Sequence, residues 1–319
     1  MPRGPFGIPD VRPIPPALPV NTDEHFVEID GARMRYLRSG SGPPIVLVHG
    51  LLGYSFSWRY VIPALSEYCT VYAVDLLGTG FSDRPVKLDC QLQPSAERLL
   101  QFLRKVGLSS FSLLGTSHGG ALSIQLAAMA AKTEEFQLQR LILVAPVNPW
   151  SPHGRWLAPA IGSRIGSWLF LNASAAQSVI YPWALRRLYG DPTRITAGTL
   201  EGYAAPAALP GFLEYGVKIA SHWRGLLREL ETALPDIAHY PTLLMWGECD
   251  RAVYASSAQH LRQQFRHCEL VVFPGAGHLP YEEAADDFNR ELIRFLTKPD
   301  PSTRAVHHPG APTSETLSR

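Results

Sequence analysis

Short apolar runs recur along the chain, and amphipathic segments separate them. The runs show little alternation of apolar and polar residues, which is typical of strands buried on both faces of a parallel sheet. They occupy residues 44–50, 70–75, 111–114, 141–145, 241–246 and 269–273. Helical patterns lie between them, at residues 55–66, 94–106, 121–129, 255–265 and 281–296. This alternation predicts an α/β fold with a mostly parallel, doubly wound sheet that helices cover on both faces.

The alternation stops between residues 146 and 235. This stretch holds helix-like segments rich in Trp and Tyr, and prolines such as Pro159 and Pro210 interrupt them. We therefore expect an inserted helical cap. Aromatic residues at helical spacing belong to a core more often than to a pocket. Five of them are candidates for the wall of a substrate pocket beneath the cap, namely Trp150, Trp156, Trp168, Tyr181 and Trp183.

The two ends of the chain differ from the middle. Seven prolines in residues 1–22 exclude a helix or an interior strand there, so we expect an extended arm. An Asp30-Gly31 turn between two alternating segments then predicts a β-hairpin. Residues 299–319 are rich in Pro, Ser and Thr and are expected to be disordered. The core of the α/β fold is predicted to comprise residues 23–145 and 236–298.

Composition restricts the partners of the protein. With 319 residues, of which 46% are hydrophobic and 18% charged, the chain can bury a large core. Its net charge of +1 provides no strong positive potential that would attract nucleic acid. No run approaches the roughly 18 apolar residues of a membrane span, and no signal sequence is recognised, so a cytoplasmic location is expected. The four cysteines lie far apart, which favours neither a zinc site nor a disulfide framework. We expect a small-molecule substrate, no metal and no cofactor, and the oligomeric state stays open.

One motif carries the chemistry. The apolar run at 111–114 stops at Gly115, and a helical pattern begins at Ala121, so Ser117 lies on a sharp turn between a strand and a helix. Gly115 and Gly119 flank it where backbones crowd together. A G-x-S-x-G pattern by itself is weak, because Gly and Ser are common in ordinary turns. In this position it predicts a nucleophile elbow with Ser117 as the nucleophile.

A serine hydroxyl needs a base, and the base needs an acid to orient it. His278 lies on a Gly-rich loop directly after a strand, where its side chain can reach the carboxyl edge of the sheet. Asp250 follows the preceding strand in the same way, with Glu248 as its nearest competitor. We predict a triad of Ser117, Asp250 and His278. Its oxyanion hole would use the backbone N–H groups of Leu51 and His118, the first on the loop after His49-Gly50 and the second at a helix N-terminus.

Taken together, these motifs resemble the α/β-hydrolase fold with a helical cap, over about residues 24–297. The resemblance rests on His49-Gly50 with Gly53, Asp75-x-x-Gly78-x-Gly80-x-Ser82, Gly115-Thr-Ser117-His-Gly119, Gly247-x-x-Asp250 and Gly277-His278. It implies the same triad and oxyanion hole. Leu77 departs from the Arg of many relatives, which puts a salt bridge in that loop in doubt. The single-glycine loop at Gly50 places the chain outside the branch of hormone-sensitive-lipase-like esterases.

The resemblance also suggests the reaction. Haloalkane dehalogenases and epoxide hydrolases of this type have Asp at the elbow, and Ser117 argues against both. We expect a serine hydrolase that cleaves apolar carboxylic esters through an acyl-enzyme. One alternative is hydrolysis of a carbon–carbon bond in a meta-cleavage product, which requires Arg and Asn in the pocket. Another is a ligand-binding homologue without activity, against which the intact triad argues.

Overall fold

A single eight-stranded sheet organises the molecule. The computed structural model describes residues 15–151, 154, 157–172 and 182–299. The strand order is β1-β2-β4-β3-β5-β6-β7-β8. The antiparallel hairpin β1–β2 forms one edge and joins β4, and all later neighbours pair in parallel. The strands are β1 (Thr22–Ile29), β2 (Ala32–Ser39), β3 (Pro44–Val48), β4 (Thr70–Val74), β5 (Ser110–Thr116), β6 (Gln137–Val144), β7 (Thr242–Gly247) and β8 (Cys268–Phe273).

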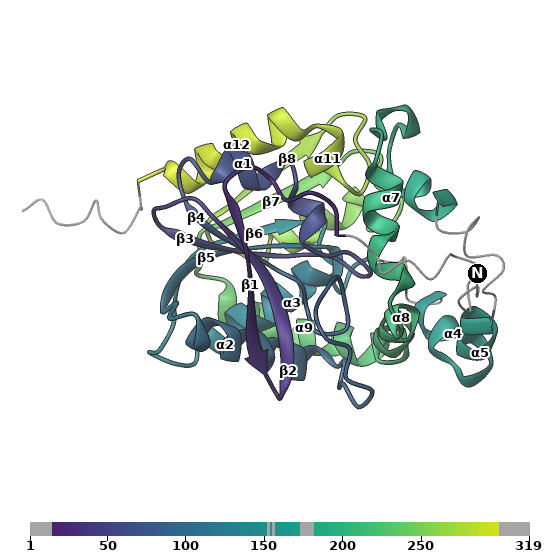
Figure 1. The fold of residues 1–319 in the computed structure, drawn as a ribbon. Helices are drawn as coiled ribbons and strands as arrows, with labels where there is room; N and C mark the ends of the chain where they lie inside the picture. The colour runs from purple at the N-terminus through teal and green to yellow at the C-terminus, as the bar shows by residue number, and fades with distance from the viewer. Residues whose placement is uncertain (1–14, 152–153, 155–156, 173–181, 300–319) are drawn as a thin grey trace, which may run out of the picture.

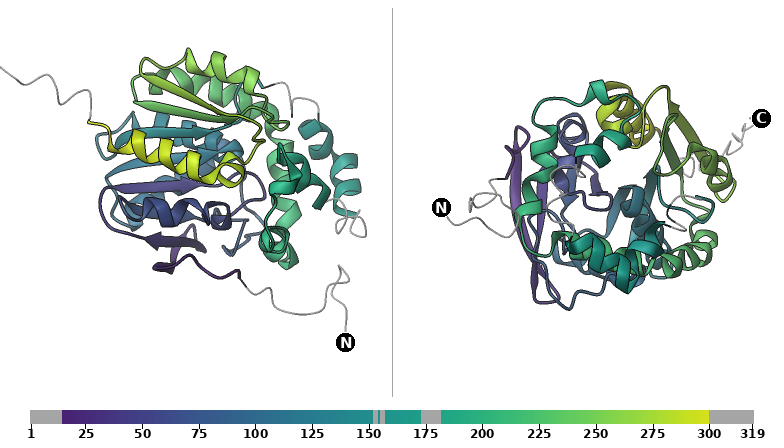
Figure 2. Two further views of the ribbon diagram at one scale, coloured as in Figure 1. Left: turned by 90° about the horizontal axis from the view of Figure 1, so that it is seen from above. Right: turned by 90° about the vertical axis from the view of Figure 1, so that its right-hand side faces the viewer.

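Helices cover both faces of this sheet (Figures 1 and 2). One layer contains α2 (Leu92–Lys105), α3 (Ser117–Ala130) and α9 (Trp223–Ile237), with α2 and α9 both packed on α3. The other contains α1 (Val61–Leu65) and α12 (Ala285–Thr297), which pack on each other. Leu47, Ile142 and Leu244 are fully buried between the layers. The predicted α/β fold with a mostly parallel, doubly wound sheet is confirmed.

The long connection from β6 to β7 builds a helical layer at the carboxyl edge of the strands (Figure 2). It contains α4 (Leu157–Gly162), α5 (Arg164–Asn172), α7 (Thr199–Ala204), α8 (Phe212–Ser221) and the 3₁₀ turns Pro192–Arg194 and Ala205–Ala208. We call the described part of this layer, which lies between residues 146 and 222, the cap. The sequence pattern also assigned residues 223–235 to the insert, but they belong to α9, which packs against α3.

Several expected helices are shorter in the structure than their sequence patterns. The predicted helix at 55–66 consists of a 3₁₀ turn (Ser55–Trp58) followed by α1, and the one at 255–265 of a 3₁₀ turn (Ala255–Ser257) followed by α10 (Ala258–Arg262). The last predicted helix is divided into α11 (Pro280–Glu283) and α12. In the part of the chain that the structure describes, no helix is both long and apolar enough to cross a membrane. The tail from residue 300 and most of the N-terminal arm lie outside the described residues.

Candidate active site

Ser117 occupies a strained turn between β5 and α3. Its φ of 53° lies in the left-handed region, which L side chains rarely adopt. The flanking glycines leave no room for a side chain. A Cβ on Gly115 would lie 2.2 Å from Ser123 Oγ, and one on Gly119 would lie 2.1 Å from the His49 carbonyl oxygen. The turn therefore presents the hydroxyl at the carboxyl edge of the sheet, as a nucleophile elbow does.

His278 and Asp250 meet at the same edge of the sheet. Asp250 follows β7, His278 follows β8, and His278 Nδ1 lies 2.7 Å from Asp250 Oδ2. The other carboxylate oxygen accepts hydrogen bonds from the N–H groups of Ala252 at 2.7 Å and Val253 at 2.9 Å. Because a carboxylate only accepts, His278 Nδ1 carries the proton and the neutral ring presents Nε2 as its acceptor. Both side chains are buried.

Glu248, the competing acid, has a different partner. Its carboxylate accepts a hydrogen bond from the N–H of Gly275 at 3.0 Å, and its side chain is exposed. The geometry therefore pairs Asp250, and not Glu248, with His278.

The candidate oxyanion loop is fixed by hydrogen bonds to one carbonyl. The carbonyl oxygen of Gly50 accepts from His49 Nδ1 at 2.8 Å and from the N–H of Gly53 at 3.0 Å. In a trans peptide the N–H points opposite to the C=O, so these two bonds also orient the N–H of Leu51. Gly50 lies against the nucleophile, since a Cβ there would be 3.1 Å from Ser117 Cβ. The N–H of His118, in the first turn of α3, has no partner within the helix and supplies the second candidate donor.

A cavity of about 170 Å³ joins these residues. Ser117 and His278 both line it, together with Leu51 of the oxyanion loop and Leu185 and Leu188 of the cap. Apart from His278, none of the described lining residues has an ionisable side chain that is charged near neutral pH. The full lining is Gly50, Leu51, Leu52, Gly53, Ser57, Thr116, Ser117, Ala184, Leu185, Leu188, Tyr203, His278, Leu279 and Tyr281.

The candidate aromatic wall does not line this cavity in the described structure. Trp150 is partly buried and stacks on His260, with ring centroids 6.2 Å apart. Trp168 and Trp183 are exposed, at 63% and 62%. Trp156 and Tyr181 lie outside the described residues. Leucines of the cap and of the oxyanion loop take the place expected for the tryptophans.

Comparison with known proteins identifies the family. The sequence profile described as the alpha/beta hydrolase family matches residues 45–291. The chain belongs to this alpha/beta hydrolase family. It is 30% identical over 298 residues to haloalkane dehalogenase 2 of Mycobacterium tuberculosis, an alignment covering 89% of this chain and 98% of the relative. It is 28% identical over 284 residues to the dihydrolipoyllysine-residue acetyltransferase component of the acetoin cleaving system of Pseudomonas putida, covering 85% and 68%.

Solved structures of other alpha/beta hydrolases show the same fold. A bacterial membrane phospholipase A superposes with a TM-score of 0.74 at 25% identity, covering 86% of each chain. A meta-cleavage product hydrolase from Pseudomonas fluorescens superposes with a TM-score of 0.71 at 23% identity, covering 85% of this chain and 97% of that one. The relatives act on different bonds, so they establish a hydrolase scaffold and leave the substrate to be argued from the site.

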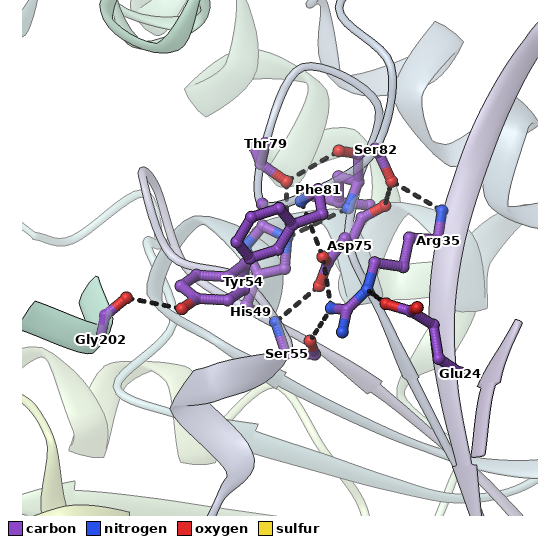
Figure 3. Close-up of polar contacts among 12 residues, drawn as sticks. Glu24, Arg35, His49, Tyr54, Ser55, Asp75, Thr79, Phe81, Ser82 and Gly202 are labelled. Atoms are coloured by element: carbon purple, nitrogen blue, oxygen red, sulfur yellow. Dashed lines mark hydrogen bonds and ion pairs between the residues drawn. The ribbon is translucent and has the colours of Figure 1, made fainter. Parts of the chain in front are cut away.

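Sequence reasoning missed an ion pair that holds the segment directly after the candidate oxyanion loop (Figure 3). Asp75 accepts from Arg35 Nη1 at 2.9 Å and from the N–H groups of Ser55 at 2.7 Å and Phe81 at 3.0 Å. Arg35 comes from the antiparallel hairpin strand β2 and is buried. Arg35 is therefore the ion-pair partner of Asp75 in this chain, which has Leu77 where many relatives have Arg. The alternation in β2 places Arg35 on the face opposite Met34 and Tyr36, so the pattern indicated an outward-facing side chain, and nothing near it in sequence indicated Asp75.

Two buried histidines, His49 and His118, lie close to Ser117 in the structure. His49 Nε2 accepts from the N–H of Leu76 at 3.1 Å, so its proton is on Nδ1, toward Gly50. Burial lowers the pKa of His49. Burial and the neighbouring His49 lower the pKa of His118 to about 4. Both rings are therefore neutral at pH 7, and neither adds a charge beside Ser117.

Proposed function

We propose that this alpha/beta hydrolase is a serine hydrolase that cleaves neutral carboxylic esters through an acyl-enzyme. Ser117 is the nucleophile, His278 the general base and Asp250 the residue that orients the base. The N–H groups of Leu51 and His118 form the oxyanion hole. The observation that carries the proposal is the 2.7 Å His278–Asp250 hydrogen bond at the edge of a cavity that Ser117 also lines.

The proposed reaction has two halves. Ser117 Oγ attacks the ester carbonyl while its proton passes to His278 Nε2, and the resulting oxyanion accepts from the two N–H groups. The imidazolium, stabilised by Asp250, then gives the proton to the departing alcohol, and the acyl-enzyme forms. In the second half water attacks the acyl-enzyme while His278 Nε2 takes its proton, and His278 then gives that proton to Ser117 Oγ as the acid product leaves.

The cavity favours an ester over the anionic dienoate of a carbon–carbon hydrolase. An anionic substrate needs a cation or several amide donors to replace its hydration. No Arg, Lys or Asn is among the described residues that line the cavity. Arg59, which lies behind one wall, forms a bidentate ion pair with Glu282 at 2.8 Å for both contacts.

We do not expect this chain to catalyse the reaction for which its dehalogenase relative is named. Displacement of a halide by that type of enzyme uses a carboxylate at the elbow, where this chain has Ser117. A hydroxyl that must lose its proton suits attack on a carbonyl, because the tetrahedral oxyanion can be stabilised by N–H donors.

The proposal is tested with purified protein, nitrophenyl butyrate and a fluorophosphonate probe. We expect ester turnover and labelling by the wild type, and loss of labelling with a drop of roughly 10⁴-fold or more in turnover for Ser117→Ala. A folded wild type without turnover or labelling would favour a ligand-binding homologue. Faster turnover of a ring-fission dienoate than of the ester would assign carbon–carbon hydrolysis instead.

A further inference from the structure

The cavity beside Ser117 has two chemically different walls. Leucines and one alanine form the first wall. Four hydroxyl side chains form the second, which we call the hydroxyl wall: Ser57, Thr116, Tyr203 and Tyr281. They come from the 3₁₀ turn after the oxyanion loop, the end of β5, α7 of the cap and α11. All four side chains are buried, at 5% exposure or less. An exclusively apolar substrate needs no such wall.

A buried carboxylate holds part of this wall in place. The hydroxyl of Tyr203 donates to Glu282 Oε1, and Tyr189, which does not line the cavity, donates to Glu282 Oε2. A phenol has one proton, and Tyr203 gives it to Glu282. The 3.2 Å contact between Tyr203 and Ser57 Oγ therefore uses the proton of Ser57. Arg59 neutralises Glu282, so the wall is polar without net charge.

The other half of the wall retains hydrogen-bonding capacity. Thr116 Oγ1 is buried and has no partner of normal hydrogen-bond geometry in the described part of the chain. It lies near enough to the Tyr281 hydroxyl to act on the pKa of that phenol, as does Tyr203. Burial raises the pKa of Tyr281 and of Tyr203. Both phenols therefore keep their protons at neutral pH, and Tyr281 is a donor beside Thr116.

A methylene chain against this wall would exclude water and leave the Tyr281 hydroxyl unsatisfied, which disfavours binding. A neutral oxygen of the substrate would instead satisfy it. A carboxylate is a poor match, because the cation that the described residues place behind the wall, Arg59, is already paired with Glu282. The chemistry of the wall is therefore that of a subsite for a hydroxyl or keto oxygen.

We propose that the substrate of this hydrolase carries a hydroxyl or keto group a few bonds from the scissile carbonyl, and that the Tyr281 hydroxyl binds this oxygen. The proposal rests on the proposed esterase function and adds a substrate class to it: hydroxy or keto esters in place of plain alkyl esters. Tyr281 determines specificity in this scheme, while Thr116, whose Oγ1 is buried behind the cavity surface, and Tyr203 position it.

Matched pairs of esters test it, because a methyl group has nearly the size of a hydroxyl. On the acyl side, the nitrophenyl ester of 3-hydroxybutyrate is compared with that of 3-methylbutyrate. On the alcohol side, 2-hydroxyethyl butyrate is compared with propyl butyrate by titration of released acid. We expect the wild type to prefer the hydroxylated member of one pair by about 10-fold in kcat/KM.

Variants locate the source of the preference. Tyr281→Phe and Thr116→Val should each bring the ratio of hydroxylated to methylated ester toward one or below it. The control is Tyr189→Phe, which removes a hydrogen bond to the same Glu282 but no hydroxyl from the cavity, and it should keep the wild-type ratio. Because the readout is a ratio, a general loss of activity does not imitate the effect.

The possible results distinguish a failure of this inference from a failure of the proposed esterase function. Absence of turnover for every ester would refute the proposed function. Two results would overturn the subsite without affecting the proposed esterase function. One is ester turnover with no preference in either pair, and the other is an equal loss of preference in Tyr189→Phe and Tyr281→Phe.

Discussion

Ser117 has a strained backbone conformation that positions its hydroxyl group. A left-handed φ costs an L residue roughly 1–2 kcal/mol, and Ser117 adopts one at the start of α3. The surrounding backbones enforce it, because Gly50 and Gly119 bring the oxyanion loop against the elbow. The strain keeps the hydroxyl and the candidate oxyanion donors at one edge of the cavity.

Asp250→Asn tests the orientation of the base. The asparagine oxygen can still accept from Ala252 and Val253, which directs its NH₂ group toward His278 Nδ1. His278 must then accept through Nδ1, and Nε2 becomes protonated and useless as a base. We expect kcat to fall by about 10⁴-fold with the fold retained, measured by ester turnover and circular dichroism. The control Glu248→Gln should keep near-wild-type kcat, and the reverse pattern would make Glu248 the acid.

His118 predicts a loss of stability on acidification. Its pKa is about 4 in the folded protein and roughly 6.5 when unfolded. Between these values the unfolded chain binds the proton and the folded protein does not, so stability falls as the pH drops. From pH 7 to pH 5 this linkage removes about 2 kcal/mol.

His118→Met should remove this part of the pH dependence. The measurement is the free energy of unfolding from urea titrations at pH 7 and pH 5, compared between wild type and variant. The same drop in both proteins would assign the acid sensitivity to other groups.

At the level of secondary-structure elements, the loop after β8 forms hydrogen bonds directly with the cap. The N–H of His278 donates to the Leu188 carbonyl at 2.6 Å. Glu283, in α11, accepts from the N–H groups of Gly277 at 2.7 Å and Gly190 at 2.8 Å. A Cβ on Gly190 would lie 2.3 Å from the Gly275 carbonyl oxygen. Backbone packing therefore couples the position of the base to cap residues 188–190.

Glu283→Gln should disturb this junction, because an NH₂ group would face one of the N–H donors. We expect kcat to fall about 10-fold with a smaller change in KM, since the base is displaced while the leucine wall remains. Gly190→Ala should act in the same way, and the double variant should be less than additive, as for residues in contact. Glu248→Gln, on an exposed acid bonded to the same loop, is the control. Additive losses would show that Glu283 and Gly190 act independently.

The cavity between cap and core limits the size of the substrate. The cavity of about 170 Å³ is bounded by leucines from both parts. Each added methylene should gain up to about 0.8 kcal/mol, a few-fold in kcat/KM, until the space is full. In a nitrophenyl series from acetate to palmitate we expect butyrate or hexanoate to be best and palmitate to be poor. Acetate or palmitate as the best substrate would contradict an apolar pocket of this size.

Local pattern was sufficient for the fold and for the residues that chemistry constrains most. Apolar runs such as that at residues 44–48 are buried strands because both of their faces are covered. Ser117, Asp250 and His278 could be selected because each directly follows a strand, and parallel strands bring their carboxyl ends to one edge. These inferences need only neighbouring residues and the rule that parallel strands align.

Contacts between distant segments were decided by the tertiary structure alone. Arg35 and Asp75 pair across 40 residues, and Glu282 joins Arg59 to Tyr203 of the cap. The predicted tryptophan wall illustrates the same limit, because Trp168 and Trp183 have the residue type of a pocket but lie on exposed faces. Periodicity tells which residues share a face of a helix. Which partner covers that face depends on how the helix packs, and that is set by the whole chain at once.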